Sequence, residues 1–127
     1  MPGNHLFEYA VVRVVPRVER EEFLNTGVIL YCRSLQFLQL KYTLHEERLK
    51  HFCEQLDVTE LKEHFCAFDH ICNGRPEGDP ISKLDMASRF RWLTAKRSTV
   101  VQTSQVHPGL CDDPGEMLEK LHTQLVL

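Results

Sequence analysis

The chain has 127 residues, 43% hydrophobic and 26% charged, which is ordinary for one soluble globular domain and excludes a mainly disordered chain. The longest apolar run near the N-terminus, residues 9–15, is interrupted by Arg13 and is much shorter than the ~20 residues that a membrane span needs. The formal net charge is -3, so a dedicated nucleic-acid binder, which is usually a strongly basic domain, is not expected.

Three strands are expected first, at residues 7–15, 28–32 and 37–42. Residues 7–15 are apolar on both alternating faces, which favours a central strand, and Pro16 ends it because proline cannot donate to a ladder. Gly27 is predicted to form a turn with positive φ. The short connections favour antiparallel neighbours.

Two helices are predicted to follow the strands. Thr43 with Glu46, and Asp57 with Glu60, have the spacing of capping boxes, in which a side chain at each position satisfies an otherwise unbonded amide. The first helix is therefore expected to open at Thr43 and the second at Asp57. Gly74 is expected to end the second helix.

The last third is predicted to hold a helix, a strand and another helix. The third helix is expected to start with Ser82 and Asp85, and its core side to contain four apolar residues: Leu84, Ala87, Phe90 and Leu93. Residues 99–103 should form the fourth strand and 104–111 a loop, and Asp113 should cap the last helix. The order β-β-β-α-α-α-β-α over residues 1–127 defines a single α+β domain, with helices covering a mainly antiparallel four-stranded sheet.

Cysteine usage and charge distribution suggest a compartment and a surface. Five cysteines with no CxxC pattern argue against a disulfide framework and favour the cytoplasm. Residues 42–70 carry seven acids and three bases, whereas residues 83–97 carry five bases and one acid. This asymmetry predicts an acidic and a basic face that could orient a partner; two ordinary solvated helix faces are the simpler alternative.

Several donors suggest an anion- or partner-binding surface, because arginine's planar fork suits phosphate and carboxylate groups. The candidate residues lie near the first strand, the third helix and the last strand: Arg13, Arg17, Arg89, Arg91, Ser98, Thr99, Gln102 and His107. Arg13 stands out because a charge on a mostly apolar face needs a partner. An internal ion pair with Glu8, Glu21 or Glu22, or a position at the edge of the sheet, is the alternative to a ligand.

No complete catalytic or metal-binding set is predicted. A serine could be drawn with His107 and Asp112 as a triad, but any short polar loop permits this, and a nucleophile elbow is missing. A possible metal pattern consists of four residues on one predicted helix: His64, Cys66, His70 and Cys72. Four ligands on one helix cannot converge tetrahedrally, so neither a metal nor a cofactor is expected.

The segments EYAVVRVVP (8–16), EEFLNTGVILYC (21–32) and RFRWLTA (89–95) occur in the order and at the spacing of a known family, as do STVVQ, VHPG and DP further on. In these segments the chain resembles the bacterial domain-of-unknown-function family 3037. The resemblance implies a small bacterial accessory protein without assigned chemistry, and a kinase-like protein of the toxin type as its partner. It supplies no catalytic residues.

Two functions are therefore considered. The favoured one is a protein-interaction or regulatory module that binds a partner through the basic third helix, with Arg89 and Arg91, and the 104–113 loop. The alternative is a small phosphate- or nucleotide-binding protein or enzyme whose cleft gathers arginine, serine and histidine side chains: Arg13, Arg17, Arg89, Ser98 and His107. The sequence does not distinguish a monomer from a homodimer.

Overall fold

The structure, a computed structural model, describes residues 5–16, 22–74, 79–97 and 99–127. Within these residues its strands are β1 (His5–Val14), β2 (Leu24–Cys32), β3 (Phe37–Tyr42), β4 (Val101–Thr103) and β5 (His107–Cys111). Its helices are α1 (Glu46–Phe52), α2 (Val58–Asn73), α3 (Met86–Leu93) and α4 (Pro114–Leu125). The predicted α+β class is confirmed, with an antiparallel sheet packed against helices.

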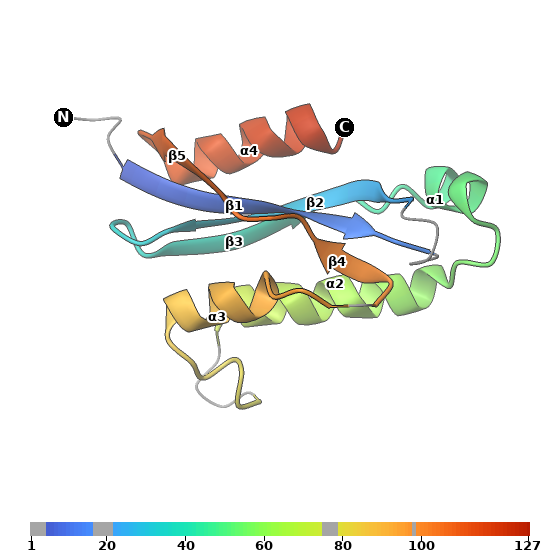
Figure 1. Cartoon of the computed structure of the whole chain (residues 1–127), viewed down its shortest axis with the longest axis horizontal. Coiled ribbons are helices and arrows are strands. Elements are labelled where there is room, and N and C mark those ends of the chain that lie inside the picture. The colour runs from blue at the N-terminus through green and yellow to red at the C-terminus, as the bar shows by residue number, and fades with distance from the viewer. Residues whose placement is uncertain (1–4, 17–21, 75–78, 98) are drawn as a thin grey trace.

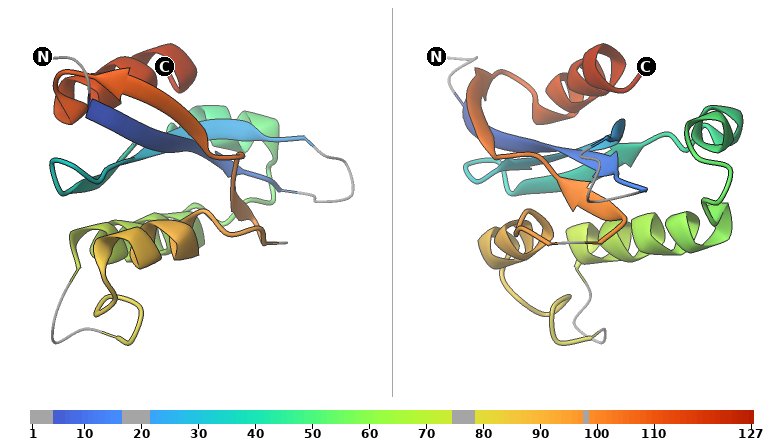
Figure 2. Two further views of the ribbon diagram at one scale, coloured as in Figure 1. Left: turned by 60° about the vertical axis from the view of Figure 1, so that its left-hand side comes forward. Right: turned by 45° about the vertical axis from the view of Figure 1, so that its right-hand side comes forward.

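The sheet lies between two layers of helices. Its strand order is β3-β2-β1-β4. Strand β5 also pairs with β1, on the same side as β4 but along the first half of β1. Strand β1 is therefore the central strand that the sequence predicts. Helix α4 covers one face of the sheet, and α2 and α3 cover the other (Figure 1, Figure 2). In the part of the chain that the structure describes, no helix is long and apolar enough to cross a membrane.

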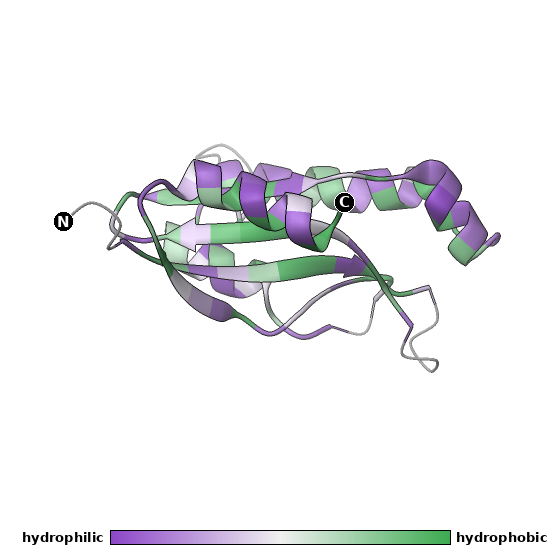
Figure 3. Ribbon diagram, turned by 90° about the horizontal axis from the view of Figure 1, so that it is seen from above, coloured by the Kyte–Doolittle hydropathy of each residue, from purple (hydrophilic) through white to green (hydrophobic). Residues whose placement is uncertain are grey.

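Residues of β1 alternate between two apolar cores. Val12 and Val14 are fully buried in the core that includes Phe65 of α2 and Phe90 of α3. Phe7 belongs to the other core, under α4. Hydrophilic and hydrophobic residues alternate along α4 (Figure 3), as expected of a helix with one face on a sheet. Burial on both faces explains why apolar residues occur on both alternating sets of positions in β1.

Three predicted helix boundaries are confirmed, and each depends on a local contact. The Asp57 carboxylate accepts from the Glu60 amide at the start of α2, and Gly74 ends this helix with φ +69°. The Asp113 side chain accepts from the Gly115 amide at 2.9 Å and starts α4. Such contacts lie within three or four residues, so a sequence pattern is enough to predict them.

Two predicted helix starts are wrong. Helix α1 begins after His45 rather than at Thr43, because the Thr43 amide donates to the Thr26 carbonyl and its hydroxyl contacts His122. Helix α3 begins after Asp85, which caps it through the Ser88 amide. Residues 82–84 therefore precede α3, and Leu84, predicted to lie in the core, is 43% exposed.

Gly27 does not form the predicted turn. It lies inside β2, opposite Val12 on one side and Tyr42 on the other, and among the described glycines only Gly74 has a positive φ. A Cβ atom at Gly27 would come within 2.9 Å of the Tyr42 Cβ and 3.1 Å of the Lys41 carbonyl oxygen. This glycine is needed for close approach of β2 and β3 rather than for a left-handed conformation.

The predicted loop at 104–111 contains a fifth strand, so the four-stranded sheet of the prediction is wrong. Pro108 and Gly109 are typical of turns, but both lie in β5 opposite Glu8 and Phe7. Proline is tolerated because β5 is an edge strand. Gly109 is tolerated because the Phe7 ring occupies the space of a side chain, with its Cζ atom 2.5 Å from where a Cβ would be.

Ser104 lies in the connection from β4 to β5, where its side-chain hydroxyl takes the place of a backbone carbonyl in bonding to β1. Its amide donates to the Val11 carbonyl at 2.8 Å, and its hydroxyl accepts from the Val11 amide at 2.8 Å. We expect Ser104→Ala to lower the free energy of unfolding by about 1–2 kcal/mol, because the Val11 amide loses its acceptor. Urea denaturation measures this, with Ser34→Ala in the exposed β2–β3 turn as the control, because in the described part of the chain the Ser34 hydroxyl contacts only the His5 and Cys32 side chains and not a backbone amide. Equal stability of the two variants would contradict the role of Ser104.

Candidate functional site

The outer edge formed by β4 and β5 is the candidate site. Both strands pair with β1, and in the described residues neither has a further strand beside it. The opposite edge, β3, packs against α2 and α4. Backbone amides and carbonyls on an open edge can bind another extended chain.

One end of this edge is apolar. Leu6 of β1 and Leu110 of β5 lie opposite each other, and each is 59% exposed. Their neighbours Phe7 and Cys111 are buried in the core under α4, so by alternation both leucines project from the other face of the sheet. Two adjacent leucines left this exposed form a small apolar surface that is available for contact.

The other end of the edge is basic. Lys96, Arg97, Gln102 and Thr103 line a hollow of about 310 Å³ where the chain leaves α3 and passes along β4. The Arg97 guanidinium donates to the Trp92 and Leu93 carbonyls at the end of α3 and lies 4.7 Å from the centre of the Trp92 ring. Burial lowers the pKa of Arg97. These bonds hold Arg97 in place, while Lys96 is exposed.

Arg89 does not reach the edge. It is 8% exposed, and its guanidinium donates to the carbonyls of Ile71, Cys72 and Leu84. Its charge therefore stabilises the C-terminal end of α2, where carbonyls are left without helical partners. Arg91, two residues further along α3, is exposed and free to contact a partner.

Arg13 lies on the opposite side of the sheet from Arg89. Its neighbours Val12 and Val14 face α2 and α3, so by alternation Arg13 points to the face that α4 covers. Its guanidinium lies 3.9 Å from the centre of the Phe23 ring, and burial lowers its pKa. Its Nε atom is buried without a hydrogen-bond partner among the described residues.

The remaining candidates lie near the edge strands or outside the described residues. Gln102 pairs with Arg13 across β1 and β4, and its side-chain amide donates to the Thr99 carbonyl. His107 is the first residue of β5 and lies in the middle of the edge, opposite Tyr9, with the centres of the two rings 5.4 Å apart. Arg17, Ser98 and the proposed ion-pair partner Glu21 lie outside the described residues. The structure thus brings Arg13, Gln102 and Thr99 together, but separates them from Arg89 and His107.

The edge includes residues that sequence reasoning did not select: Leu6, Leu110, Lys96 and Arg97. The two leucines follow an alternating pattern that is equally typical of core positions. The run Lys96-Arg97 is a usable signal, because it places two positive charges just before the predicted fourth strand.

The cysteine thiols differ strongly in their surroundings. Cys72 is buried, and burial raises its pKa to about 12, whereas Cys66 is exposed on α2, with its sulfur 3.7 Å from His70 Nε2. In the described residues, no three side chains of His, Cys, Asp or Glu lie close enough to hold a metal ion.

We expect iodoacetamide to alkylate Cys66 of the folded protein at least tenfold faster than Cys72, because the exposed thiolate is the nucleophile. Peptide mass spectrometry over time measures both rates. In urea the two rates should converge, which controls for intrinsic reactivity. Equal rates in the folded protein would contradict the burial of Cys72.

The sheet, its two helical layers and its open edge define a small α+β domain. Residues 9–126 match the family described as a protein of unknown function, DUF3037, and the chain belongs to this family. The match confirms the resemblance seen in the sequence. No curated protein and no solved structure matches the chain.

Proposed function

We propose that this domain is a protein-interaction module that binds an extended segment of a partner protein along the β4–β5 edge. The observation that carries the proposal is the pair of exposed leucines, Leu6 and Leu110, beside strands with an open edge. Addition of a strand to a sheet edge is a common mode of peptide recognition, in which backbone hydrogen bonds supply affinity and side chains supply specificity.

The edge itself limits unspecific pairing. Pro108 has no amide hydrogen, and β4 and β5 are interrupted at residues 104–106. Both features are typical of edges protected from aggregation, and they reduce the number of backbone bonds that a partner can form. Recognition therefore depends on side chains at the two ends of the edge.

These side chains indicate the chemistry of the partner segment. An apolar residue of the partner would pack on Leu6 and Leu110, and an acidic residue would contact Lys96, with Arg91 adding charge on α3. The proposed surface still includes the predicted basic helix and the 104–113 segment, but Lys96 rather than Arg89 contacts the acidic residue of the partner. A kinase-like protein, which the sequence resemblance implies, is the partner that we propose.

The first experiment is capture from the native host with the tagged domain. Leu110→Asp and Lys96→Glu are each expected to reduce capture of the partner at least fivefold. Leu110→Asp places a charge in the apolar contact, and Lys96→Glu makes the positive charge of Lys96 negative, so that it repels an acidic partner residue. The matched controls are Leu35→Asp, in the exposed β2–β3 turn, and Lys120→Glu, on the exposed side of α4. Loss of capture by the controls alone would place the interface elsewhere.

The second experiment tests strand addition directly. The captured protein is purified, mixed with the domain, and followed by amide hydrogen exchange. New protection is expected in residues 101–111, because edge amides gain acceptors. Protection confined to other elements would overturn the proposal. Concentration-dependent self-association that Leu110→Asp abolishes would instead identify a second copy of this chain as the occupant.

The alternative function, binding of a phosphate or nucleotide, receives less support. It requires Arg13, Arg89 and His107 to share a cleft. The Arg89 guanidinium, however, already donates to two carbonyls at the end of α2 and to the Leu84 carbonyl. Thermal shift with nucleotides and phosphorylated metabolites distinguishes the functions. A bound ligand at a hundredfold excess over its Kd should stabilise the protein by about 2.7 kcal/mol.

A further inference from the structure

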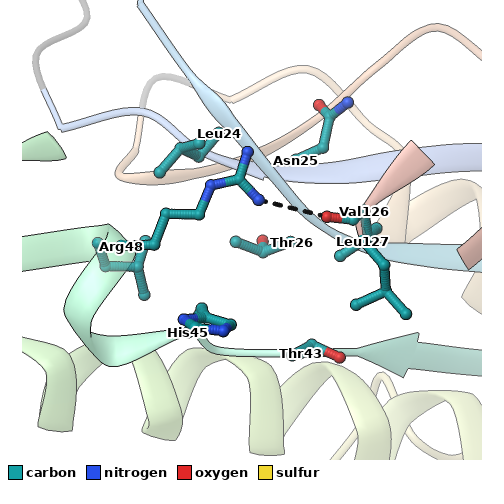
Figure 4. Close-up of a pocket in the computed structure, with 9 residues that line it drawn as sticks. Leu24, Asn25, Thr26, Thr43, His45, Arg48, Val126 and Leu127 are labelled. Atoms are coloured by element: carbon teal, nitrogen blue, oxygen red, sulfur yellow. Dashed lines mark hydrogen bonds between the residues drawn. The ribbon is translucent and has the colours of Figure 1, made fainter. Parts of the chain in front are cut away.

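A pocket of about 240 Å³ opens at the end of the sheet where β2 begins (Figure 4). It lies between β2, the connection from β3 to α1, helix α1, and the end of α4. Its walls are formed by nine residues: Leu24, Asn25, Thr26, Thr43, His45, Arg48, Leu49, Val126 and Leu127. None of these residues belongs to the β4–β5 edge.

The inner wall of the pocket is apolar and firmly held. Leu49 is 1% exposed and belongs to the core between the sheet and α2, and Val126 is buried in the core under α4. Leu24 packs against the first of these cores. An apolar cavity with a few polar groups is the usual form of a small-molecule site.

The threonines of the pocket are already engaged. The Thr26 hydroxyl donates to the Val12 carbonyl at 3.2 Å, and the Thr43 hydroxyl lies 2.9 Å from His122 Nε2. The Asn25 amide group donates to the Leu125 carbonyl and points away from the middle of the pocket (Figure 4). The remaining polar side chains of the lining are those of His45 and Arg48, at the start of α1 and within it.

Arg48 extends its guanidinium across the mouth of the pocket toward Val126 (Figure 4). Its Nη1 atom donates to the Val126 carbonyl over 3.4 Å, which is long for a hydrogen bond. Among the described residues, no carboxylate forms an ion pair with Arg48. Most of its N–H donors thus remain available beside an apolar cavity.

We propose that this pocket binds a small organic carboxylate with an apolar body. The carboxylate would accept from the Arg48 guanidinium, whose planar fork matches its geometry. The hydrocarbon part would lie against Leu24, Leu49 and Val126. The volume is below the roughly 300–1,000 Å³ of pockets for drug-sized ligands and has room for about eight water-sized groups, so the ligand is of the size of hexanoate or benzoate.

The test compares hexanoate, hexan-1-ol and hexylamine as probes, with binding followed by NMR shifts of the backbone amides. Hexanoate is expected to shift amides of residues 24–26 and 43–49, and to bind about threefold to tenfold more tightly than hexan-1-ol, as a partly exposed ion pair allows. Hexylamine should bind more weakly than either.

Two variants separate the role of the charge from that of the cavity. Arg48→Gln should bring hexanoate to the affinity of hexan-1-ol, while Arg33→Gln, which removes the same charge from an exposed turn, should leave both unchanged. Leu24→Trp fills the cavity and should abolish binding of both probes. Equal binding of the two probes to the unmodified domain, or shifts confined to other elements, would overturn the proposal, as would failure of all three probes to bind.

Discussion

Replacement of Arg89 by methionine is expected to lower the free energy of unfolding by about 3–5 kcal/mol, since it leaves several buried carbonyls without donors. The Nη1 atom of Arg89 donates to the Ile71 and Cys72 carbonyls at 2.9 and 2.8 Å, and its Nε donates to the Leu84 carbonyl at 3.0 Å. Methionine is unbranched and replaces the aliphatic part of the arginine side chain, but it has no donor. Urea denaturation followed by circular dichroism measures the loss.

Arg91→Met is the matched control, because it removes the same charge from the same helix at an exposed position. Its effect should stay within about 0.5 kcal/mol. If the two variants lose the same small amount of stability, the carbonyls at the end of α2 have another donor, and the role assigned to Arg89 is wrong. A large loss for Arg89→Met alone also shows why this residue cannot serve as a freely accessible anion ligand.

The contacts of Arg89 could not be predicted from the sequence. The pattern of α3 correctly predicts a helix with Phe90 and Leu93 in the core. It does not show that α3 packs beside the end of α2, which brings Arg89 to the carbonyls of residues 71 and 72. That contact joins residues 17 and 18 positions apart, and no local rule distinguishes it from a solvated arginine.

The same contrast between local and distant contacts applies to the rest of the fold. Strands β1 to β3 and the starts of α2 and α4 follow from alternation and from caps a few residues away. The predicted start at Thr43 is wrong because its partners, Thr26 and His122, come from distant parts of the chain. Strand β5 was predicted as a loop because Pro108 and Gly109 are usual in turns, whereas here the central strand β1 aligns them.

The candidate site was harder to predict than the fold. The charge of residues 83–97 indicates a basic surface near α3, but exposure of Leu6 and Leu110 depends on which strand lies at the edge of the sheet. A leucine that alternates with polar residues is normally assigned to a core. Only the pairing of β5 with β1 brings these two leucines together at the edge, where each is 59% exposed.

Gly27→Val tests the strongest correction to the sequence-based fold and should lower the free energy of unfolding by about 2–3 kcal/mol, as overpacking of a core does. Strand propensity alone predicts the opposite, because valine is favoured in strands and glycine is not. The close contacts of a Cβ atom at this position are with the Tyr42 Cβ, at 2.9 Å, and the Lys41 carbonyl oxygen, at 3.1 Å. Neither belongs to the flexible end of a side chain, so β2 and β3 must separate.

Gly115→Ala provides the control, since the nearest atom to its Cβ is the Asp113 carboxylate oxygen at 3.3 Å and the position is in the first turn of α4. Its effect should lie within about 1 kcal/mol, with helix propensity favouring alanine. Thermal and urea denaturation compare the two variants. A Gly27→Val protein as stable as the unmodified domain would mean that β2 tolerates a side chain at this position, and that the close approach of β2 and β3 does not require glycine.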